Sequence, residues 1–277
     1  MSVLPRAKPF SAPWRHATYG PSMHARRLAL LLLVLWAHAA QASDIGISPP
    51  RLDLVGAPGE RLSATVTVIT SGPTERQVAA ELGDWTMDYR GEMAFFPGGS
   101  LEHSAAGWIQ LDADAFVLTR DASREVRLEI TIPPDAEGTH HAMAFFTVVP
   151  PPSETAGVGV LTTTRVGLTV YVTVAGSERG TAELVDLYPS NDRTLTATIA
   201  NGGNTVVRLG GAIELRNEAG EVVRRLPVPD VPVLRESERE LVLALPDDLP
   251  SGFYVALALI EDGRGNVLAG EIALDLP

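Results

Sequence analysis

The segments HHAMAFFTVVP (residues 140–150) and VGVLTTTRVGLTVYVTVAG (residues 158–176) lie on either side of a proline-rich loop. Every second position of the later segment is apolar, apart from Thr162 and Thr164: Val158, Val160, Val166, Leu168, Val170, Val172 and Val174. Apolar residues with a period of two predict a strand with one buried face. Strands are usually about 5–6 residues long. We therefore expect this strand to extend beyond its own domain and to offer an edge to another chain.

The two halves of this strand are expected to differ. Leu168 to Val174 is predicted to lie in the core of its own domain, which is the commoner position for valine and leucine. Val158 to Val166, at the end near the loop, is the part predicted to contact a partner. In strand addition, backbone hydrogen bonds supply affinity and alternate side chains supply specificity.

The rest of the chain from Ile45 onward predicts an all-β protein. No window of a dozen residues keeps helical spacing without a Gly or Pro. Short alternating segments recur instead between turn residues, and the first of them is bent at Pro49-Pro50. The predicted strands are 45–55, 62–70, 77–86, 108–111, 116–118, 125–132 and the long pair, then 182–188, 195–200, 212–216, 222–226, 239–245, 253–260 and 267–274.

The strand count predicts two immunoglobulin-like β-sandwich domains in tandem. Residues 44–176 hold about seven strands in roughly 130 residues, which is typical of such a sandwich. A short polar linker, Gly176 to Gly180, separates them from a smaller sandwich in residues 181–277. Its turns carry Asn201-Gly202-Gly203-Asn204 and similar motifs that favour hairpins or corners.

Residues 1–42 are predicted to be a leader. Met23 is followed by basic residues, then by the apolar run Leu28 to Trp36 and a cleavage motif ending at Ala42. The run is short for a membrane span. We expect export to the periplasm, cleavage near Ala42 and no membrane span in the mature chain, with Met23 as the expected initiator.

Charge and cysteine content exclude several classes of protein. The chain has 22 basic and 34 acidic residues, and five of the basic residues lie in the leader. The mature chain therefore has 17 basic and 34 acidic residues, and its formal net charge is −17. Such an acidic exported protein is a poor candidate for binding nucleic acid. There are no cysteines, so the chain has neither disulfides nor a thiol nucleophile.

Three segments resemble the periplasmic chaperones of pilus (fimbrial) assembly. ISPPRLDLVG (47–56) resembles the opening strand of that family with its basic residue. WIQLDADAFVLTRDASREVRLEITIP (108–133) and HHAMAFFTVVPPP (140–152) resemble two further segments, the latter ending in a Pro-Pro turn. The resemblance covers Ile45 to about Val174, and the second domain matches only in being a sandwich.

The resemblance implies a function and a set of site residues. Chaperones of this family donate alternating apolar residues of their seventh strand to the incomplete sandwich of a pilin subunit, which makes Val158, Val160 and Val166 the implied donors. They also anchor the C-terminal carboxylate of the subunit with two basic residues. Arg51 matches the first of these. The second is normally a lysine, which the mature chain lacks, and Arg165 is the nearest basic residue.

Other interpretations remain open on the sequence alone. Each arginine could pair with one of the chain's own acids, because such surface ion pairs are common. The chain could also be an exported structural or adhesive protein that binds a surface partner without being a chaperone. Neighbouring strand residues point to opposite faces, so His140 and His141 are not expected to bind one metal. With no catalytic motif, we expect no enzyme activity, no metal and no cofactor.

Overall fold

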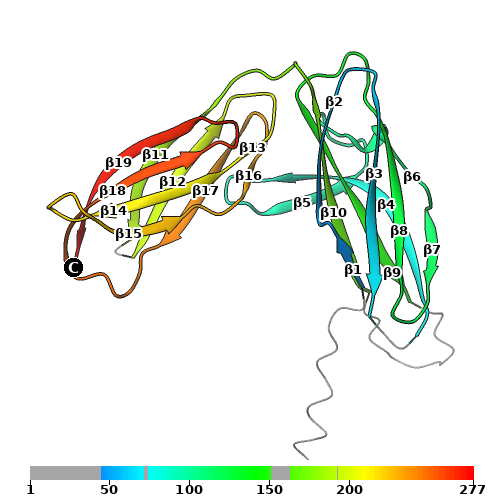
Figure 1. The fold of residues 1–277 in the computed structure, drawn as a ribbon, viewed down its shortest axis with the longest axis horizontal. Helices are drawn as coiled ribbons and strands as arrows, with labels where there is room; N and C mark the ends of the chain where they lie inside the picture. Colours follow the sequence, from blue (N-terminus) through cyan, green and yellow to red (C-terminus); the bar gives the residue numbers. More distant parts are fainter. Residues whose placement is uncertain (1–44, 72–73, 151–162, 192) are drawn as a thin grey trace, which may run out of the picture. The chain divides into compact units, whose positions relative to one another are not determined.

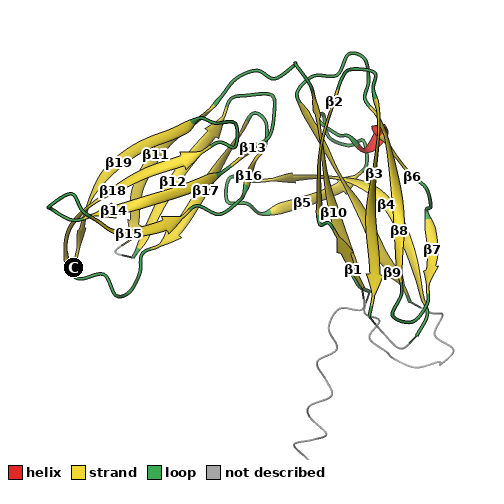
Figure 2. Ribbon diagram, in the orientation of Figure 1, coloured by secondary structure: helices red, strands yellow, loops and turns green. Residues whose placement is uncertain are grey.

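The computed structural model describes residues 45–71, 74–150, 163–191 and 193–277. The predicted leader and the donor positions Val158 and Val160 lie outside these residues. The all-β prediction is confirmed, because the described chain folds into strands with one short 3₁₀ helix, η1 (Ala106–Trp108) (Figures 1 and 2). No described helix is long and apolar enough to cross a membrane.

The first sandwich, residues 45–174, consists of two sheets. One has the strand order β1-β3-β8-β6 and the other β2-β10-β9-β4-β5, with β7 also beside β4. The bounds are Ile45–Ser48 (β1), Arg51–Gly56 (β2), Arg61–Thr70 (β3), Arg76–Met87 (β4), Met93–Pro97 (β5), Ile109–Leu111 (β6), Ala115–Leu118 (β7), Ser123–Thr131 (β8), Thr139–Val149 (β9) and Arg165–Val174 (β10).

The second sandwich, residues 182–276, contains the remaining strands. A sheet of order β11-β12-β17 faces a sheet of order β15-β14-β18-β19, and β13 pairs with β16. The bounds are Ala182–Asn191 (β11), Thr194–Asn201 (β12), Val207–Arg208 (β13), Gly210–Arg216 (β14), Val222–Pro227 (β15), Pro232–Val233 (β16), Ser237–Ala244 (β17), Gly252–Glu261 (β18) and Val267–Leu276 (β19).

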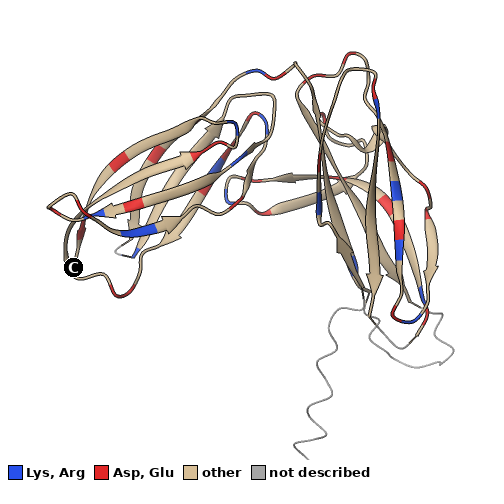
Figure 3. Cartoon of the chain, viewed as in Figure 1, with Lys and Arg blue, Asp and Glu red and all other residues tan. Residues whose placement is uncertain are grey.

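Each sandwich has its own apolar core, formed by the alternate positions of its strands. Leu168, Val170, Val172 and Val174 are fully buried in the first core, as predicted. On β8, the alternate residues point to solvent instead and carry charges of alternating sign: Glu125, Arg127 and Glu129 (Figure 3). The period of two therefore separates a buried face from a solvated one.

The bend predicted at Pro49-Pro50 moves the first strand from one sheet to the other. The Ser48–Pro49 peptide bond is cis. Before it, β1 pairs antiparallel with β3, and after it, β2 pairs parallel with β10. Proline lacks an N–H group and cannot continue a ladder, so this is where the strand leaves one sheet for the other.

Candidate functional site: the free edge of β10 and its arginines

The sheet switch leaves part of β10 without a neighbour. Beside β10, β2 pairs only from Arg51, which is opposite Thr169, to Gly56, opposite Val174. The stretch Arg165 to Leu168 pairs with β9 on one side. On its other side no strand pairs with it among the residues that the structure describes. We call this stretch, on the side away from β9, the β10 edge.

The backbone groups that this edge presents follow from the hydrogen bonds on either side of it. The Val148 N–H donates to the Thr164 carbonyl at 2.9 Å, and the Thr169 N–H donates to the Pro50 carbonyl at 3.2 Å. Backbone groups of successive strand residues point to opposite sides. The N–H and C=O groups of Arg165 and Gly167 therefore point, like those of Thr169, to the side away from β9, where a further strand can bind them.

The core-facing side chains of this stretch already pack in the core of the first sandwich. Leu168 is fully buried, and Val166 is partly buried and packs against the core of the first sandwich. What the described stretch offers a partner is therefore its backbone.

Arg165 lies on the opposite face of the sheet and has two partners in its own chain. Its Nη2 donates to Glu81 Oε1 at 2.6 Å. Its guanidinium also lies 3.5 Å from the centroid of the Phe145 ring, in cation–π geometry. Phe145 is almost fully buried under this cover.

Two glycines allow this packing. A Cβ atom at Gly83 would lie 2.8 Å from Phe145 Cε2, and one at Gly167 would lie 2.6 Å from Met143 Sδ. Both distances are too short for real contacts, so Phe145 and Met143 lie flat on the sheet only because these positions carry no side chain.

Arg51 belongs to a cluster of four charged residues. Its Nε donates to Asp53 Oδ2 at 2.6 Å, and its Nη1 donates to Asp230 Oδ2 at 3.2 Å. Arg208 Nη1 donates to the other oxygen of Asp230 at 3.0 Å. Hydrogen bonds from Arg208 and Arg51 hold the pKa of Asp230 below its usual value. The Arg51 side chain is 37% exposed, so a carboxylate from solvent can reach it if it displaces Asp230.

A cavity of about 480 Å³ adjoins this cluster, and its lining includes Asp53, Tyr171, Arg208 and Arg264. The Arg208 guanidinium lies 5.2 Å from the centroid of the Tyr171 ring. Burial raises the pKa of Tyr171 to about 12, so the phenol is neutral at physiological pH. The lining also includes Glu178 and Asp262, so three carboxylates face two arginines and the charge of this cavity does not favour an anion.

The structure does not bring Arg51 and Arg165 together. Arg51 is opposite Thr169, four residues along β10 from Arg165. At about 3.3 Å per residue, their backbones are separated by roughly 13 Å along the strand. Each guanidinium already has a carboxylate of the same chain, so the two do not form one bidentate site in this arrangement.

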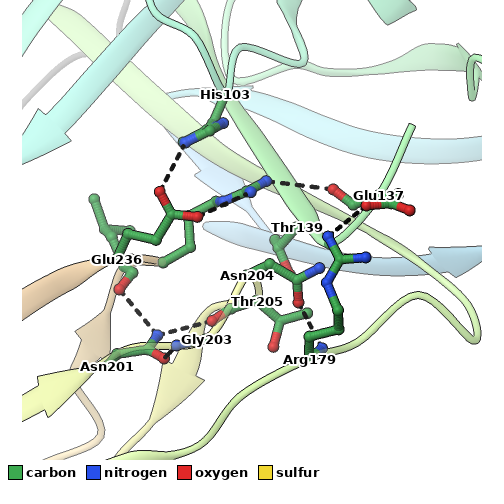
Figure 4. Close-up of polar contacts among 12 residues, drawn as sticks. His103, Glu137, Thr139, Arg179, Asn201, Gly203, Asn204, Thr205 and Glu236 are labelled. Carbon is green, nitrogen blue, oxygen red and sulfur yellow. Dashed lines mark hydrogen bonds and ion pairs between the residues drawn. The ribbon is translucent and has the colours of Figure 1, made fainter. Parts of the chain in front are cut away.

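A second polar cluster was not found by sequence reasoning. It joins residues 103 and 137–141 to residues 177–179, 201–205 and 234–236 (Figure 4). The Thr139 N–H donates to the Asn204 carbonyl at 2.9 Å, and Arg179 forms an ion pair with Glu137. Asn201 is buried and forms four hydrogen bonds within this cluster. The motif Asn201-Gly202-Gly203-Asn204 indicated a turn in the sequence, but nothing showed what it would contact.

The two neighbouring histidines lie on different faces, as the alternation of a strand requires. The His140 ring lies 4.2 Å from the Trp108 ring, whereas His141 Nε2 is 3.0 Å from the Trp85 carbonyl oxygen. Within the described ranges there is no group of three His, Cys, Asp or Glu residues that could hold a metal ion.

Comparison with protein-family models finds no match, and no curated protein matches the chain. Among solved structures, the chain is similar to a chaperone–tip adhesin complex of CFA/I fimbriae, with 13% identity, a TM-score of 0.48, and coverage of 84% of this chain and 99% of that one. It is also similar to the class 5 fimbrial chaperone CfaA, with 14% identity, a TM-score of 0.47 and the same coverage.

A third similar structure is the E. coli chaperone DraB, with 12% identity, a TM-score of 0.43, and coverage of 84% of this chain and 96% of that one. These names belong to the family that the sequence resembles.

Proposed function

We propose that this protein is a periplasmic chaperone of pilus- or fimbria-type subunits, which binds a subunit by β-strand addition at the β10 edge. The observation that carries the proposal is that, among the described residues, no strand pairs with the N–H and C=O groups of Arg165 and Gly167 on the side away from β9. An unpaired edge in a sheet is a ready template for another strand. The sequence resemblance supplies the class of partner.

The proposal gives the predicted site residues distinct roles. Val158 and Val160 extend the binding strand and contribute side chains to the incomplete sandwich of the subunit, whereas the side chain of Val166 packs against the chain's own core. Arg51 binds the C-terminal carboxylate of the subunit, which replaces the carboxylate of Asp230 as its partner. Arg165 contributes its backbone, while its guanidinium stays over Phe145.

A proline at position 165 tests strand addition directly. Arg165→Pro removes an N–H group that points to the free edge, at the first residue of a strand, where proline is tolerated. The matched control Arg165→Ala removes the same side chain but keeps the N–H group. We expect Arg165→Pro to bind a co-expressed pilin-like subunit at least about fivefold more weakly than Arg165→Ala, since one hydrogen bond contributes about 1 kcal/mol.

The measurement is the dissociation constant of the purified complex, with circular dichroism to show that both variants keep their strands. Equal binding by the two variants would exclude strand addition at this edge. If neither variant nor wild type binds any pilin-like subunit, the structural or adhesive alternative is favoured instead.

The carboxylate anchor makes a separate prediction. Arg51→Ala should weaken subunit binding by about 10- to 100-fold, because a hydrogen bond to a charged group contributes about 1.5–3 kcal/mol. Asp230→Asn should strengthen binding, because it removes the carboxylate that competes for Arg51. Arg61→Ala, at an exposed position of β3, is the matched control and should change nothing.

A subunit extended by a few residues at its C-terminus shows whether the carboxylate is the group that Arg51 binds. Against this subunit, Arg51→Ala should cause no further loss, since the two changes remove the same contact. Fully additive losses would show that Arg51 acts elsewhere, while leaving strand addition at β10 intact.

A further inference from the structure

Strand β18 is apolar on both faces. Its inward residues Tyr254, Ala256, Ala258 and Ile260 are buried in the core of the second sandwich. Its outward residues are also apolar as far as Leu259, namely Phe253, Val255, Leu257 and Leu259, and the strand ends at the exposed Glu261. A continuous apolar run is typical of strands covered on both faces, whereas a strand with one face in water usually alternates.

The outer face of β18 has no cover among the described residues. Phe253 is 50% exposed, and Val255, Leu257 and Leu259 are partly exposed and belong to none of the apolar core clusters. Some neighbouring outward positions add small side chains, with Ala212 on β14 and Ala269 opposite Leu259, and Ala273 opposite Val255, whereas Glu214 and Glu271 lie opposite Leu257. We call Phe253, Val255, Leu257, Leu259, Ala212, Ala269 and Ala273 the β18 face.

The charges beside this face differ between its two sides. On one side, Glu214 on β14 accepts hydrogen bonds from Arg216 and forms an ion pair with Arg225, at 2.6 and 2.7 Å, which leaves one net positive charge. On the other side, β19 presents Glu271 and Asp275, both exposed. Figure 3 shows blue on β15 and red on β19, and β18 is tan along most of its length.

We propose that a second copy of this chain packs on the β18 face, with its β18 parallel to the first and a twofold axis along the strand direction. Rotation about such an axis places the acidic β19 side of one copy over the basic β14–β15 side of the other. A twofold axis perpendicular to the strands, in the plane of the sheet, would instead place the acidic β19 side of one copy over the acidic β19 side of the other. Like charges would then face each other. The face is therefore complementary to itself in one orientation, as a symmetric dimer requires.

The packing expected of this dimer is that of two stacked sheets. Sheets that face each other lie about 10 Å apart, with their inner side chains interdigitated. Phe253 and Leu257 are large enough to fill that space, and the alanines beside them leave room for the partner's side chains. Arg225, Glu271 and Asp275 are exposed on either side of β18, whereas Glu214 is buried and paired with Arg216 and Arg225.

The apolar part of the proposal is tested by Leu257→Lys. Its control is Val242→Lys, the same change of charge at a residue of β17 that is 66% exposed. Light scattering after size-exclusion chromatography should show the full-length mature protein reaching the mass of two chains as its concentration rises. Val242→Lys should reach the mass of two chains at the same concentrations as wild type, whereas Leu257→Lys should keep the mass of one chain. A wild-type protein that keeps the mass of one chain at every concentration would overturn the proposal.

Charge exchange tests the orientation. Glu271→Arg should weaken the dimer about tenfold, because each exposed ion pair contributes modestly and the change acts twice in a symmetric interface. Glu271→Arg combined with Arg225→Glu should restore most of the loss. Glu183→Arg, on β11 of the opposite sheet, should leave the dimer unchanged. A double variant no tighter than the single variants would contradict the parallel arrangement.

Discussion

Asn201→Asp is expected to destabilise the chain strongly, although aspartate has the same shape as asparagine. The two N–H hydrogens of Asn201 Nδ2 are shared among the carbonyl oxygens of Thr205, Val233 and Leu234, which lie at 2.8, 3.1 and 2.9 Å. Its Oδ1 atom accepts the Gly203 N–H at 3.0 Å. The side chain thus joins the end of β12 to the segment before β17, and it is buried.

Aspartate has the same shape but no donor. It would place a carboxylate oxygen against three carbonyl oxygens in a buried site, where an unpaired polar group costs about 1–3 kcal/mol and a charge costs more. We expect the free energy of unfolding to fall by about 3–5 kcal/mol. Urea unfolding followed by circular dichroism measures this fall.

Asn191→Asp is the matched control for this change. Asn191 is exposed, and its side chain accepts one hydrogen bond from the Arg193 N–H at 2.9 Å. Aspartate keeps that acceptor, so the free energy of unfolding of the control should lie within about 0.5 kcal/mol of the wild-type value. Similar unfolding curves for Asn201→Asp and Asn191→Asp would show that the Asn201 hydrogen bonds do not hold this region together.

Local pattern was sufficient to predict much of the fold. Alternation predicted the strands and placed Leu168 to Val174 in the core, because a period of two fixes which side chains share a face. The proline pair at 49–50 predicted the bend. The short strand β5, Met93–Pro97, was missed because all five residues are exposed and the segment has no alternation. Its position is decided by pairing with β4.

The candidate site was less predictable than the fold. Arg51 and Arg165 were singled out by type and position, but the sequence does not reveal which of its acids each would meet. Asp230 lies 179 positions after Arg51, and Glu81 lies 84 positions before Arg165. Such contacts depend on how strands far apart in the chain come together. The cover that Arg165 gives Phe145 likewise follows from the glycines on two neighbouring strands.

Three histidines near Arg235 make the stability of the protein sensitive to acid. His140 contacts Trp108, lies 5.9 Å from His103 between ring centroids, and faces Arg235 and Glu137. His103 lies near Glu236 and Glu102, and His141 lies against Trp85 near Asp84. The pKa of His140 is lowered from 6.5 to about 4. Burial is the largest cause, and the positive charge of Arg235 is the second. Burial also lowers the pKa values of His103 and His141.

A lowered histidine pKa means that the folded protein favours the neutral ring. The unfolded chain then binds more protons than the folded one between pH 6.5 and about 4, so the stability is fully present above pH 6.5 and is lost as the pH falls through this window. The shift of His140 corresponds to about 3 kcal/mol. Because the ring is partly exposed, we reduce this to about 1–2 kcal/mol for solvent screening.

His140→Gln removes the titrating ring, so the free energy of unfolding should fall less steeply with acid than in wild type. The measurement is urea unfolding at several values between pH 7.5 and pH 4, and the difference between the two curves removes the contribution of the carboxylates. Arg235→Gln should raise the pKa of His140, which NMR titration of the ring can follow, because it removes a neighbouring positive charge. Parallel stability curves for wild type and His140→Gln would contradict this account, since a group that binds no extra proton on unfolding cannot change the slope.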